Sequence, residues 1–261
     1  MEEKILKQAL EDLPIPIIRY FEETDSTNEQ ALGMAASGAE DNTLVIAEKQ
    51  TAGRGRMGRC WVTAPGSSLA FSLIFKPTKA EEEYLGLFSM LGALAVCRAI
   101  QEQFCADAQV KWPNDVLLGG MKTAGILAES CWQGDTLAGL VLGIGINLLP
   151  GSVPPAEKLL FPATCVQAHC SKPVNRLIFL EAVLRHVFTL RKSITKNAFM
   201  VEYARHLAFI GRRITLSSTA GNAVSGVLAG VERDGQIILQ MDDGERKAYP
   251  IGDVHLRPDG S

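Results

Sequence analysis

The sequence predicts a mixed α/β (α+β) fold with a mostly antiparallel sheet backed by helices, followed by a small separate β-domain. Two observations predict it. Up to residue 208, short apolar or β-branched runs alternate with segments of helical periodicity, which is typical of α/β chains. From residue 209 onward, short alternating runs are separated by hairpin-turn residues, which indicates a β-meander. The 261 residues are therefore expected to form a large domain, 1–208, and a small one, 209–261.

Each expected element follows from a local pattern. Ser26-Thr27-Asn28-Glu29 fits a capping box and predicts a helix that begins at Ser26. The strands between 110 and 146 are separated by glycine turns. Long crossover connections are absent there, which favours a meander over repeated βαβ units. The expected helices cover 2–11, 26–37, 84–104, 177–191 and 199–209. The expected strands cover 15–21, 43–48, 68–75, 110–112, 117–118, 123–130, 137–146, 213–216, 224–231, 236–241 and 246–251, the last four separated by turns at 220–222, 234–235 and 242–244.

Composition excludes several classes of protein. With 26 basic and 29 acidic residues the net charge is −3, so the overall basic excess of a protein that binds nucleic acid with its whole surface is absent. The six cysteines contain no C-x-x-C pair and the N-terminal segment is charged, unlike a signal peptide, which predicts a cytoplasmic protein. The most apolar stretch, 85–100, is shorter than the roughly 18 residues of a spanning helix and predicts a buried helix, with no membrane partner.

A glycine- and arginine-rich loop at 53–59 is the strongest local motif. It matches G-x-G-x-x-G, but a dinucleotide-binding turn opens directly into a helix, whereas residues 60–66 continue as strand and turn. Arg54, Arg56 and Arg59 offer guanidinium groups suited to phosphate or carboxylate, in a stretch, 49–80, without any acidic residue. The loop therefore predicts a closing anion-binding segment, with a solvated basic loop or an RNA contact as the alternative.

Three further clusters have both a functional and a structural interpretation. Residues 111–115, Lys-Trp-Pro-Asn-Asp, together with Lys122, could hold Mg²⁺ and a phosphorylated ligand, or could form an ordinary turn. The glycines in 143–147 admit a flat ligand against the backbone, or a tight strand contact. Residues 24–28 cap a helix, and the free N–H groups at a helix start can also bind a ligand.

Taken together and in this order, these motifs resemble the biotin protein ligases. The matching segments are 25–28, Gln50 with 52–56, 111–115, Lys122 with 124–127, and 143–147. The resemblance spans roughly 17–257 and implies the class II synthetase-like catalytic fold of the biotin and lipoate ligases, with an SH3-like C-terminal β-barrel. It implies ATP-dependent formation of biotinyl-5′-AMP and transfer of biotin to a lysine of the biotin carboxyl carrier protein of acetyl-CoA carboxylase.

The resemblance also assigns site residues. Lys122 and Arg56 are implied in adenylation, and Asp115 in deprotonation of the acceptor lysine. The biotin-binding residues implied are Ser26, Thr27, Asn28, Gln50, Gly53, Arg54, Lys122, Gly125, Ile126, Gly143 and Gly145. The residues implied for ATP and the adenylate are Arg54, Arg56, Arg59, Trp61, Lys111, Asn114 and Asn147, with Asn114 also near Mg²⁺.

The sequence departs from the pattern of the biotin protein ligases at two positions. Met57 stands where many members have another arginine, and Cys60 is commonly a lysine in some members. Only one helical segment precedes the first strand, so the helix-turn-helix head of repressor members, and hence DNA binding, is not expected. A homodimer is compatible with the resemblance. The alternatives are a lipoate or octanoate ligase on the related fold, and a nucleic-acid-binding module that uses Arg54, Arg56 and Arg59.

Overall fold

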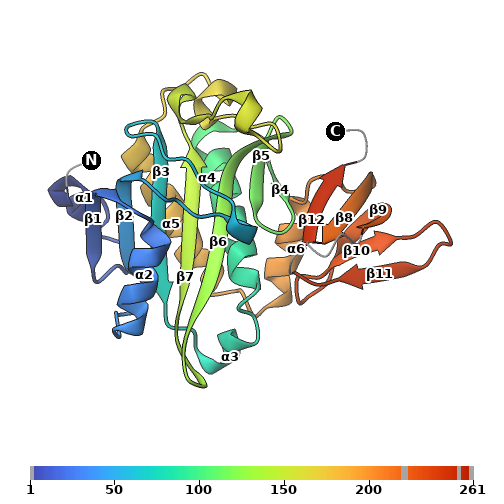
Figure 1. Ribbon diagram of the computed structural model, residues 1–261, viewed down its shortest axis with the longest axis horizontal. Coiled ribbons are helices and arrows are strands. Elements are labelled where there is room, and N and C mark those ends of the chain that lie inside the picture. Colours follow the sequence, from blue (N-terminus) through green and yellow to red (C-terminus); the bar gives the residue numbers. More distant parts are fainter. Residues whose placement is uncertain (1–2, 219–222, 252–253, 259–261) are drawn as a thin grey trace.

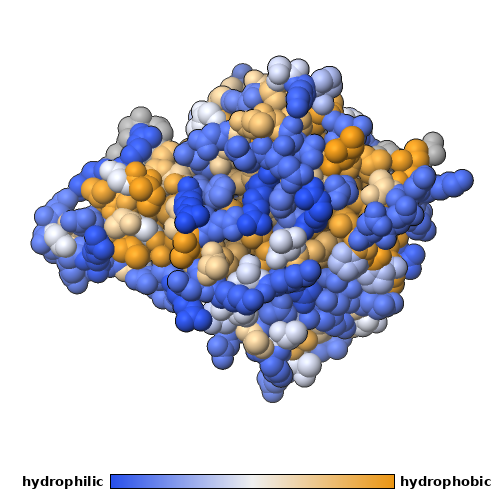
Figure 2. All heavy atoms as spheres, turned by 180° about the vertical axis from the view of Figure 1, so that it is seen from behind, coloured by the Kyte–Doolittle hydropathy of each residue, from blue (hydrophilic) through white to orange (hydrophobic). Residues whose placement is uncertain are grey.

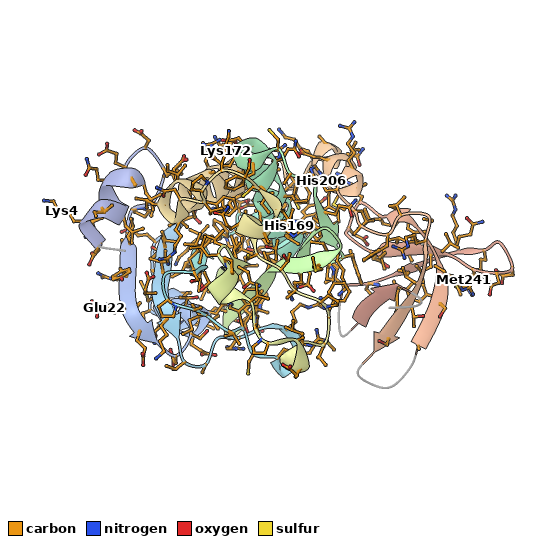
Figure 3. All side chains as sticks on the ribbon, turned by 90° about the horizontal axis from the view of Figure 1, so that it is seen from above. Lys4, Glu22, His169, Lys172, His206 and Met241 are labelled. Carbon is orange, nitrogen blue, oxygen red and sulfur yellow. The ribbon has the colours of Figure 1, made fainter. Side chains whose placement is uncertain are left out.

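The computed structural model describes residues 3–218, 223–251 and 254–258. A seven-stranded sheet with helices on both faces stands beside a five-stranded sheet (Figure 1). Seen from above, Glu22 in the first strand and Met241, between β10 (Ile237–Gln240) and β11 (Arg246–Tyr249) of the second sheet, lie at opposite ends of the molecule (Figure 3). The predicted order of a large α/β part followed by a β-meander is confirmed.

The large sheet has the strand order β1-β2-β3-β7-β6-β5-β4. β1 and β2 are parallel and the other neighbouring pairs are antiparallel, as the predicted mostly antiparallel sheet requires. Its strands are β1 (Ile18–Thr24), β2 (Thr43–Gln50), β3 (Ser68–Phe75), β4 (Ala108–Lys111), β5 (Asp115–Leu118), β6 (Met121–Gln133) and β7 (Thr136–Asn147). β3 has its predicted bounds, whereas β1 begins later than predicted, after Pro16, which has no N–H for a ladder hydrogen bond.

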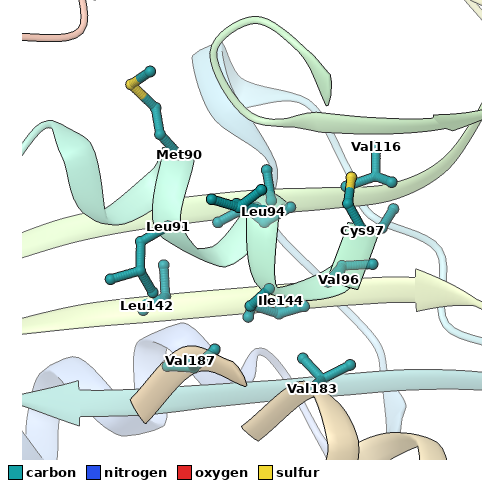
Figure 4. Close-up of a cluster of buried hydrophobic side chains, with 14 of the residues drawn as sticks. Met90, Leu91, Leu94, Val96, Cys97, Val116, Leu142, Ile144, Val183 and Val187 are labelled. Carbon is teal, nitrogen blue, oxygen red and sulfur yellow. The ribbon is translucent and has the colours of Figure 1, made fainter. Parts of the chain in front are cut away.

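Two long helices cover one face of this sheet and enclose the main core. α4 (Leu87–Phe104) is apolar almost all round and packs on β4, β5, β6 and β7, while α5 (Arg176–Arg191) packs beside it and contacts β3. Figure 4 shows Leu91 and Leu94 of α4 against Leu142 and Ile144 of β7, in one buried cluster with Val187 of α5. Burying each such side chain stabilises the fold by about 1.5–3 kcal/mol.

Among the described α-helices, α2 (Thr27–Ala36) covers the opposite face. Its alanines pack closely on the sheet, in a small cluster made of Ala31, Ala35, Val45, Ile74 and Val141. α2 is short and covers only part of this face, where it packs on β2, β3, β7 and β6. The part of the sheet beside its N-terminus stays open, and the predicted site residues lie there.

The predicted capping box at the start of α2 is wrong. Ser26 is the N-cap residue, but its side chain makes no capping hydrogen bond. The N–H of Thr27 donates instead to Oε1 of Gln50 at 2.8 Å, and Glu29 binds Arg54. Side chains from distant parts of the chain have replaced the local cap.

The remaining helices are short. The helix predicted at 84–104 begins only at Leu87, because Thr78 and Glu81 form a capping box that starts a separate helix upstream. The helix predicted at 199–209 ends at Arg205, because the backbone of 206–208 pairs with Val110 of β4. These elements are α1 (Glu3–Ala9), α3 (Lys79–Glu82) and α6 (Asn197–Arg205), with one-turn 3-10 helices η1 (Arg56–Gly58), η2 (Pro150–Ser152), η3 (Ala156–Lys158) and η4 (Val166–His169).

The C-terminal sheet is antiparallel with the order β11-β10-β9-β8-β12. Its strands are β8 (Arg213–Ser218), β9 (Ala223–Val231), β10 (Ile237–Gln240), β11 (Arg246–Tyr249) and β12 (Val254–Pro258). β12 was not predicted, and the predicted turn at 220–222 lies outside the described residues. The domain boundary at 208/209 stays a prediction.

The back of the molecule is mostly hydrophilic, with a group of apolar residues over the C-terminal sheet (Figure 2). Within the part of the chain that the structure describes, no helix combines the length and apolar character that a membrane crossing needs.

Candidate active site

A cavity lies on the α2 face of the large sheet. The end of β2, the start of α2 and the loop 53–61 meet β5, β6 and β7 there. It brings together every predicted site residue except Gly53 and Asn147. The predicted residues that line it are Ser26, Thr27, Asn28, Gln50, Arg54, Arg56, Arg59, Trp61, Lys111, Asn114, Asp115, Lys122, Gly125, Ile126, Gly143 and Gly145.

The floor of the cavity is a row of small residues across four strands. Ala70, Gly145, Gly125 and Asp115 are successive register partners on β3, β7, β6 and β5, so they face the same side. A Cβ on Gly145 would overlap the indole of Trp61, and one on Gly125 would lie 3.1 Å from it. The absence of side chains on Gly145 and Gly125 therefore lets the indole of Trp61 lie directly on the sheet. The role of these glycines beside biotin stays a prediction.

Neutral polar groups line one end of the cavity. Oε1 of Gln50 accepts hydrogen bonds from the N–H and the hydroxyl of Thr27, at 2.8 and 3.1 Å, and its Nε2 donates to Thr63 at 3.1 Å. Ser26, only 1% exposed, lies beside them. Gln50 is thus held in one amide orientation. This end offers uncharged donors and acceptors, which suits a neutral polar head group.

Charged groups line the other end. Asp115 on β5 lies 2.6 Å from the ammonium of Lys122 and 3.6 Å from that of Lys111. Burial alone would raise the pKa of the Asp115 carboxyl, but the two ammonium groups lower it below its ordinary value. Burial lowers the pKa of Lys111 against the pull of Asp115, and the positive charges of Lys122 and Arg59 act in the same direction as burial. Two cations around one carboxylate leave this end positively charged.

Arg56 adds a third cation and is fixed through Asn114. Its Nη1 donates to Oδ1 of Asn114 at 3.0 Å, while Nδ2 of Asn114 donates to the Ile126 carbonyl at 2.7 Å. The side-chain oxygens of Asn114 and Asp115 therefore already face cations. Among the described residues, no group of three or more His, Cys, Asp or Glu side chains could hold a metal. This donor set does not fit a protein-built Mg²⁺ site, so a contact between Asn114 and Mg²⁺ stays a prediction.

The Gly/Arg loop forms a compact hairpin over the cavity. The N–H of Gly55 donates to the Arg59 carbonyl at 2.7 Å, and that of Trp61 to the Gly53 carbonyl at 2.8 Å. A Cβ on Gly53 would overlap the Trp61 carbonyl, so Gly53 serves this close approach and does not line the cavity. Nε1 of Trp61 is buried without a hydrogen-bond partner, which leaves a donor available to a ligand.

A second cavity adjoins the first through Arg59, Cys60, Trp61, Lys111, Asp115 and Lys122. Asn147, at the end of β7, lines this second cavity and donates to the Thr164 carbonyl at 3.2 Å. The ammonium of Lys111 lies 4.7 Å from the centre of the Phe161 ring. The two cavities share the charged end, so a ligand with two parts could occupy both.

Four residues at the site were missed by the sequence interpretation. Glu29 and Glu129 bind Arg54, Ser72 lies 2.6 Å from Oδ1 of Asn28, and Thr63 holds Gln50. Ser72 interrupts the apolar run 68–75, and Glu129 interrupts the apolar strand 123–130. Polar residues inside otherwise apolar strands were the available signal.

The sequence matches models of known protein families. Residues 20–147 match the biotin/lipoate A/B protein ligase family, and residues 209–257 match the biotin protein ligase C-terminal domain. The chain is 31% identical over 250 residues to the bifunctional ligase/repressor BirA of Bacillus subtilis, covering 91% of this chain and 73% of that protein.

It is also 33% identical over 245 residues to the biotin–[acetyl-CoA-carboxylase] ligase of Paracoccus denitrificans, covering 88% of this chain and 97% of that protein. The solved biotin protein ligase of Aquifex aeolicus in complex with biotin and ATP superposes with a TM-score of 0.79 at 26% identity, covering 94% of this chain and 100% of that one. Fold, cavity and sequence agree, and this chain belongs to the biotin protein ligases.

Proposed function

We propose that this protein is an ATP-dependent biotin–protein ligase. It activates biotin as biotinyl-5′-AMP and transfers it to a lysine of the biotin carboxyl carrier protein of acetyl-CoA carboxylase. The observation that carries the proposal is the single cavity with a neutral polar end, a glycine floor and a positively charged end. That order matches biotin, which has a neutral ureido head, an apolar chain and a carboxylate.

In the first step, a carboxylate oxygen of biotin attacks the α-phosphorus of ATP. A new P–O bond forms, the bond to the β-phosphate oxygen breaks, and pyrophosphate leaves. Two anions must approach each other, so positive charge has to be concentrated where they meet. Lys122 and Arg56 supply it at the charged end of the cavity. Asn147 lines the second cavity and Trp61 lines both, and we assign the second cavity to the adenosine part.

In the second step, the amine of the acceptor lysine attacks the acyl carbon and AMP leaves. A free lysine amine has a pKa of about 10.4, so the ammonium must lose a proton before it can attack. Because Lys122 and Lys111 lower the pKa of Asp115, its carboxylate is ionised at neutral pH. We assign to Asp115 the binding of the incoming ammonium and the acceptance of its proton.

Lack of DNA binding, homodimer formation and a requirement for Mg²⁺ stay predictions from the resemblance. A cytoplasmic location agrees with the six cysteines, all of which are free thiols. The division into a catalytic domain, 1–208, and a C-terminal domain, 209–261, is also part of the proposal.

The proposal is tested by incubating the protein with ATP, Mg²⁺, labelled biotin and an apo carrier domain. We expect label on the carrier lysine, and none on a carrier whose lysine is replaced by arginine or when ATP is omitted. Octanoate and lipoate serve as competing acids. Transfer of either one, with no transfer of biotin by the folded protein, would replace the proposal with a lipoate-type ligase.

A further inference from the structure

Arg54 is held between two carboxylates that come from different elements. Its Nη1 binds Oε1 of Glu29 on α2, and its Nη2 lies 2.6 Å from Oε1 of Glu129 on β6. We call Glu29, Arg54 and Glu129 the Arg54 clamp. The side chain of Glu129 is the more buried carboxylate, 21% exposed against 47% for Glu29. The clamp fastens the first part of the Gly/Arg hairpin to both walls of the cavity.

The second oxygen of Glu129 ties the clamp to the cavity wall. Oε2 accepts a hydrogen bond from Nδ2 of Asn28 at 2.8 Å, and Oδ1 of Asn28 lies 2.6 Å from the hydroxyl of Ser72 on β3. A Cβ on Gly143 would overlap Oδ1 of Asn28, so that glycine admits the amide. Glu129 thus connects the Gly/Arg hairpin to the sheet: Oε1 binds Arg54 of the hairpin, and Oε2 binds Asn28, which contacts β3.

The two ends of the cavity differ in their charged groups. Two carboxylates face Arg54, whereas Arg56 meets the neutral amide of Asn114 at the end where Lys111 and Lys122 lie. A phosphate is therefore attracted toward the end where Lys111 and Lys122 flank the single carboxylate of Asp115, and is repelled from the clamp, where two carboxylates face one guanidinium. The clamp makes the cavity electrically asymmetric along its length, which favours one direction of an elongated acid inside it.

We propose that Glu129, with the smaller help of Glu29, is a positioning residue that closes the Gly/Arg hairpin through Arg54 and so retains the acyl-adenylate. The inference rests on the proposed function for the identity of the retained molecule. Neither glutamate touches the reacting atoms. Each acts through Arg54, which predicts that their effects disappear when Arg54 is already absent.

The first experiment needs no ligase activity. Trypsin cleaves after Arg56 and Arg59 only when the hairpin opens, and mass spectrometry measures the rate at these two bonds. For Glu129→Gln we expect cleavage about tenfold faster, and for Glu29→Gln about threefold faster. Glu23→Gln is the matched control, because Glu23 forms an ion pair with Lys49 on the surface, at 2.7 Å, and should leave the rate unchanged.

The second experiment measures release of biotinyl-AMP from the enzyme and labelling of free lysine in solution. We expect Glu129→Gln to raise both about tenfold, with no further rise when it is added to Arg54→Gln. Unchanged cleavage and release in Glu129→Gln would overturn the inference, and so would a full effect in the Arg54→Gln background. If the wild-type protein forms no adenylate, the proposed function fails, while the cleavage rates still decide the clamp.

Discussion

We propose that Lys122 contacts both reacting anions of the first step. Its ammonium lies 2.6 Å from Asp115 and 5.7 Å from the centre of the Trp61 ring, over the glycine floor. One cation can therefore contact the biotin carboxylate and the α-phosphate as they approach, while Asp115 fixes its position. No other lysine of the cavity has this contact with the ring among the described residues.

We predict that Lys122→Ala lowers the rate of adenylate formation at least about a hundredfold, because the charge that compensates the two anions is lost. Biotin-dependent exchange of pyrophosphate into ATP measures the rate. Lys49→Ala, which removes a surface ion pair with Glu23, should keep normal exchange. Normal exchange by Lys122→Ala would contradict the role given to Lys122.

At the start of α2, a contact made only in the folded protein replaces the local pattern of the sequence. The spacing of Ser26 and Glu29 allows a capping box, yet Glu29 binds Arg54 instead. A capping box is one local choice with a modest free energy, about 1 kcal/mol. A guanidinium 25 residues away in the chain competes for the same carboxylate, and only the folded loop brings it there.

At the scale of elements, β2 and α5 are joined by an ion pair that anchors the segment after the hairpin. Oε1 of Glu48 lies 2.6 Å from Nη1 of Arg176 and accepts the N–H of Gly66 at 2.9 Å. Burial opposes ionisation of Glu48, but Arg176 and the Gly66 N–H outweigh it and lower the pKa of Glu48 to about 2. The pair fixes the turn at 63–67 against the sheet.

This pair should make stability depend on pH between about 4.5 and 2. The folded pKa of Glu48 lies below its ordinary value of 4.5, so its stabilisation is complete above pH 4.5 and is lost as the pH falls toward 2. Melting temperatures of the wild type and of Glu48→Gln should differ at pH 7 and converge near pH 2. Glu23→Gln is the surface control, and curves for Glu48→Gln that stay parallel to the wild type would refute the link.

Element types were largely predictable, and their ends were not. β3 is buried along its whole length, is apolar except at Ser68 and Ser72, and contains no glycine or proline, so its predicted bounds are the observed ones. The start of α4 was misplaced, because the same charged and apolar residues at 79–86 also fit a short helix and a turn. Ends are decided by small differences in capping and packing, which local patterns do not resolve.

At the scale of the whole molecule, the C-terminal sheet supports the segment that carries the charged end of the cavity. Nε1 of Trp112, which is 2% exposed, donates to the carbonyl of Gly235 at 2.9 Å. Gly235, in the turn between β9 and β10, has a φ of 89°, and a Cβ there would lie 2.7 Å from Leu87. The hydroxyl of Tyr203 on α6 donates to the Pro113 carbonyl at 3.3 Å. The segment 111–115 is thus held from the C-terminal sheet and from α6.

We predict that Trp112→Phe destabilises the protein by about 1–2 kcal/mol, because the buried Gly235 carbonyl loses its donor. The rate of adenylation should fall about tenfold as Lys111 and Asp115 lose one support. Urea unfolding and pyrophosphate exchange measure the two effects. Trp132→Phe, at an indole that is 54% exposed on β6, should change neither, and an unchanged exchange rate in Trp112→Phe would exclude this coupling of the two sheets.

The sequence by itself determined the class of the fold, the succession of most helices and strands along the chain and the residues available for chemistry, because periodicity and motif spacing are properties of neighbouring residues. It identified the family from motifs that are weak singly and specific together. Only the tertiary structure decided which groups meet. Arg54 with Glu129, Trp112 with Gly235 and Glu48 with Arg176 are separated by 75, 123 and 128 residues. Such pairs depend on strand register and on the packing of elements, which no local pattern encodes.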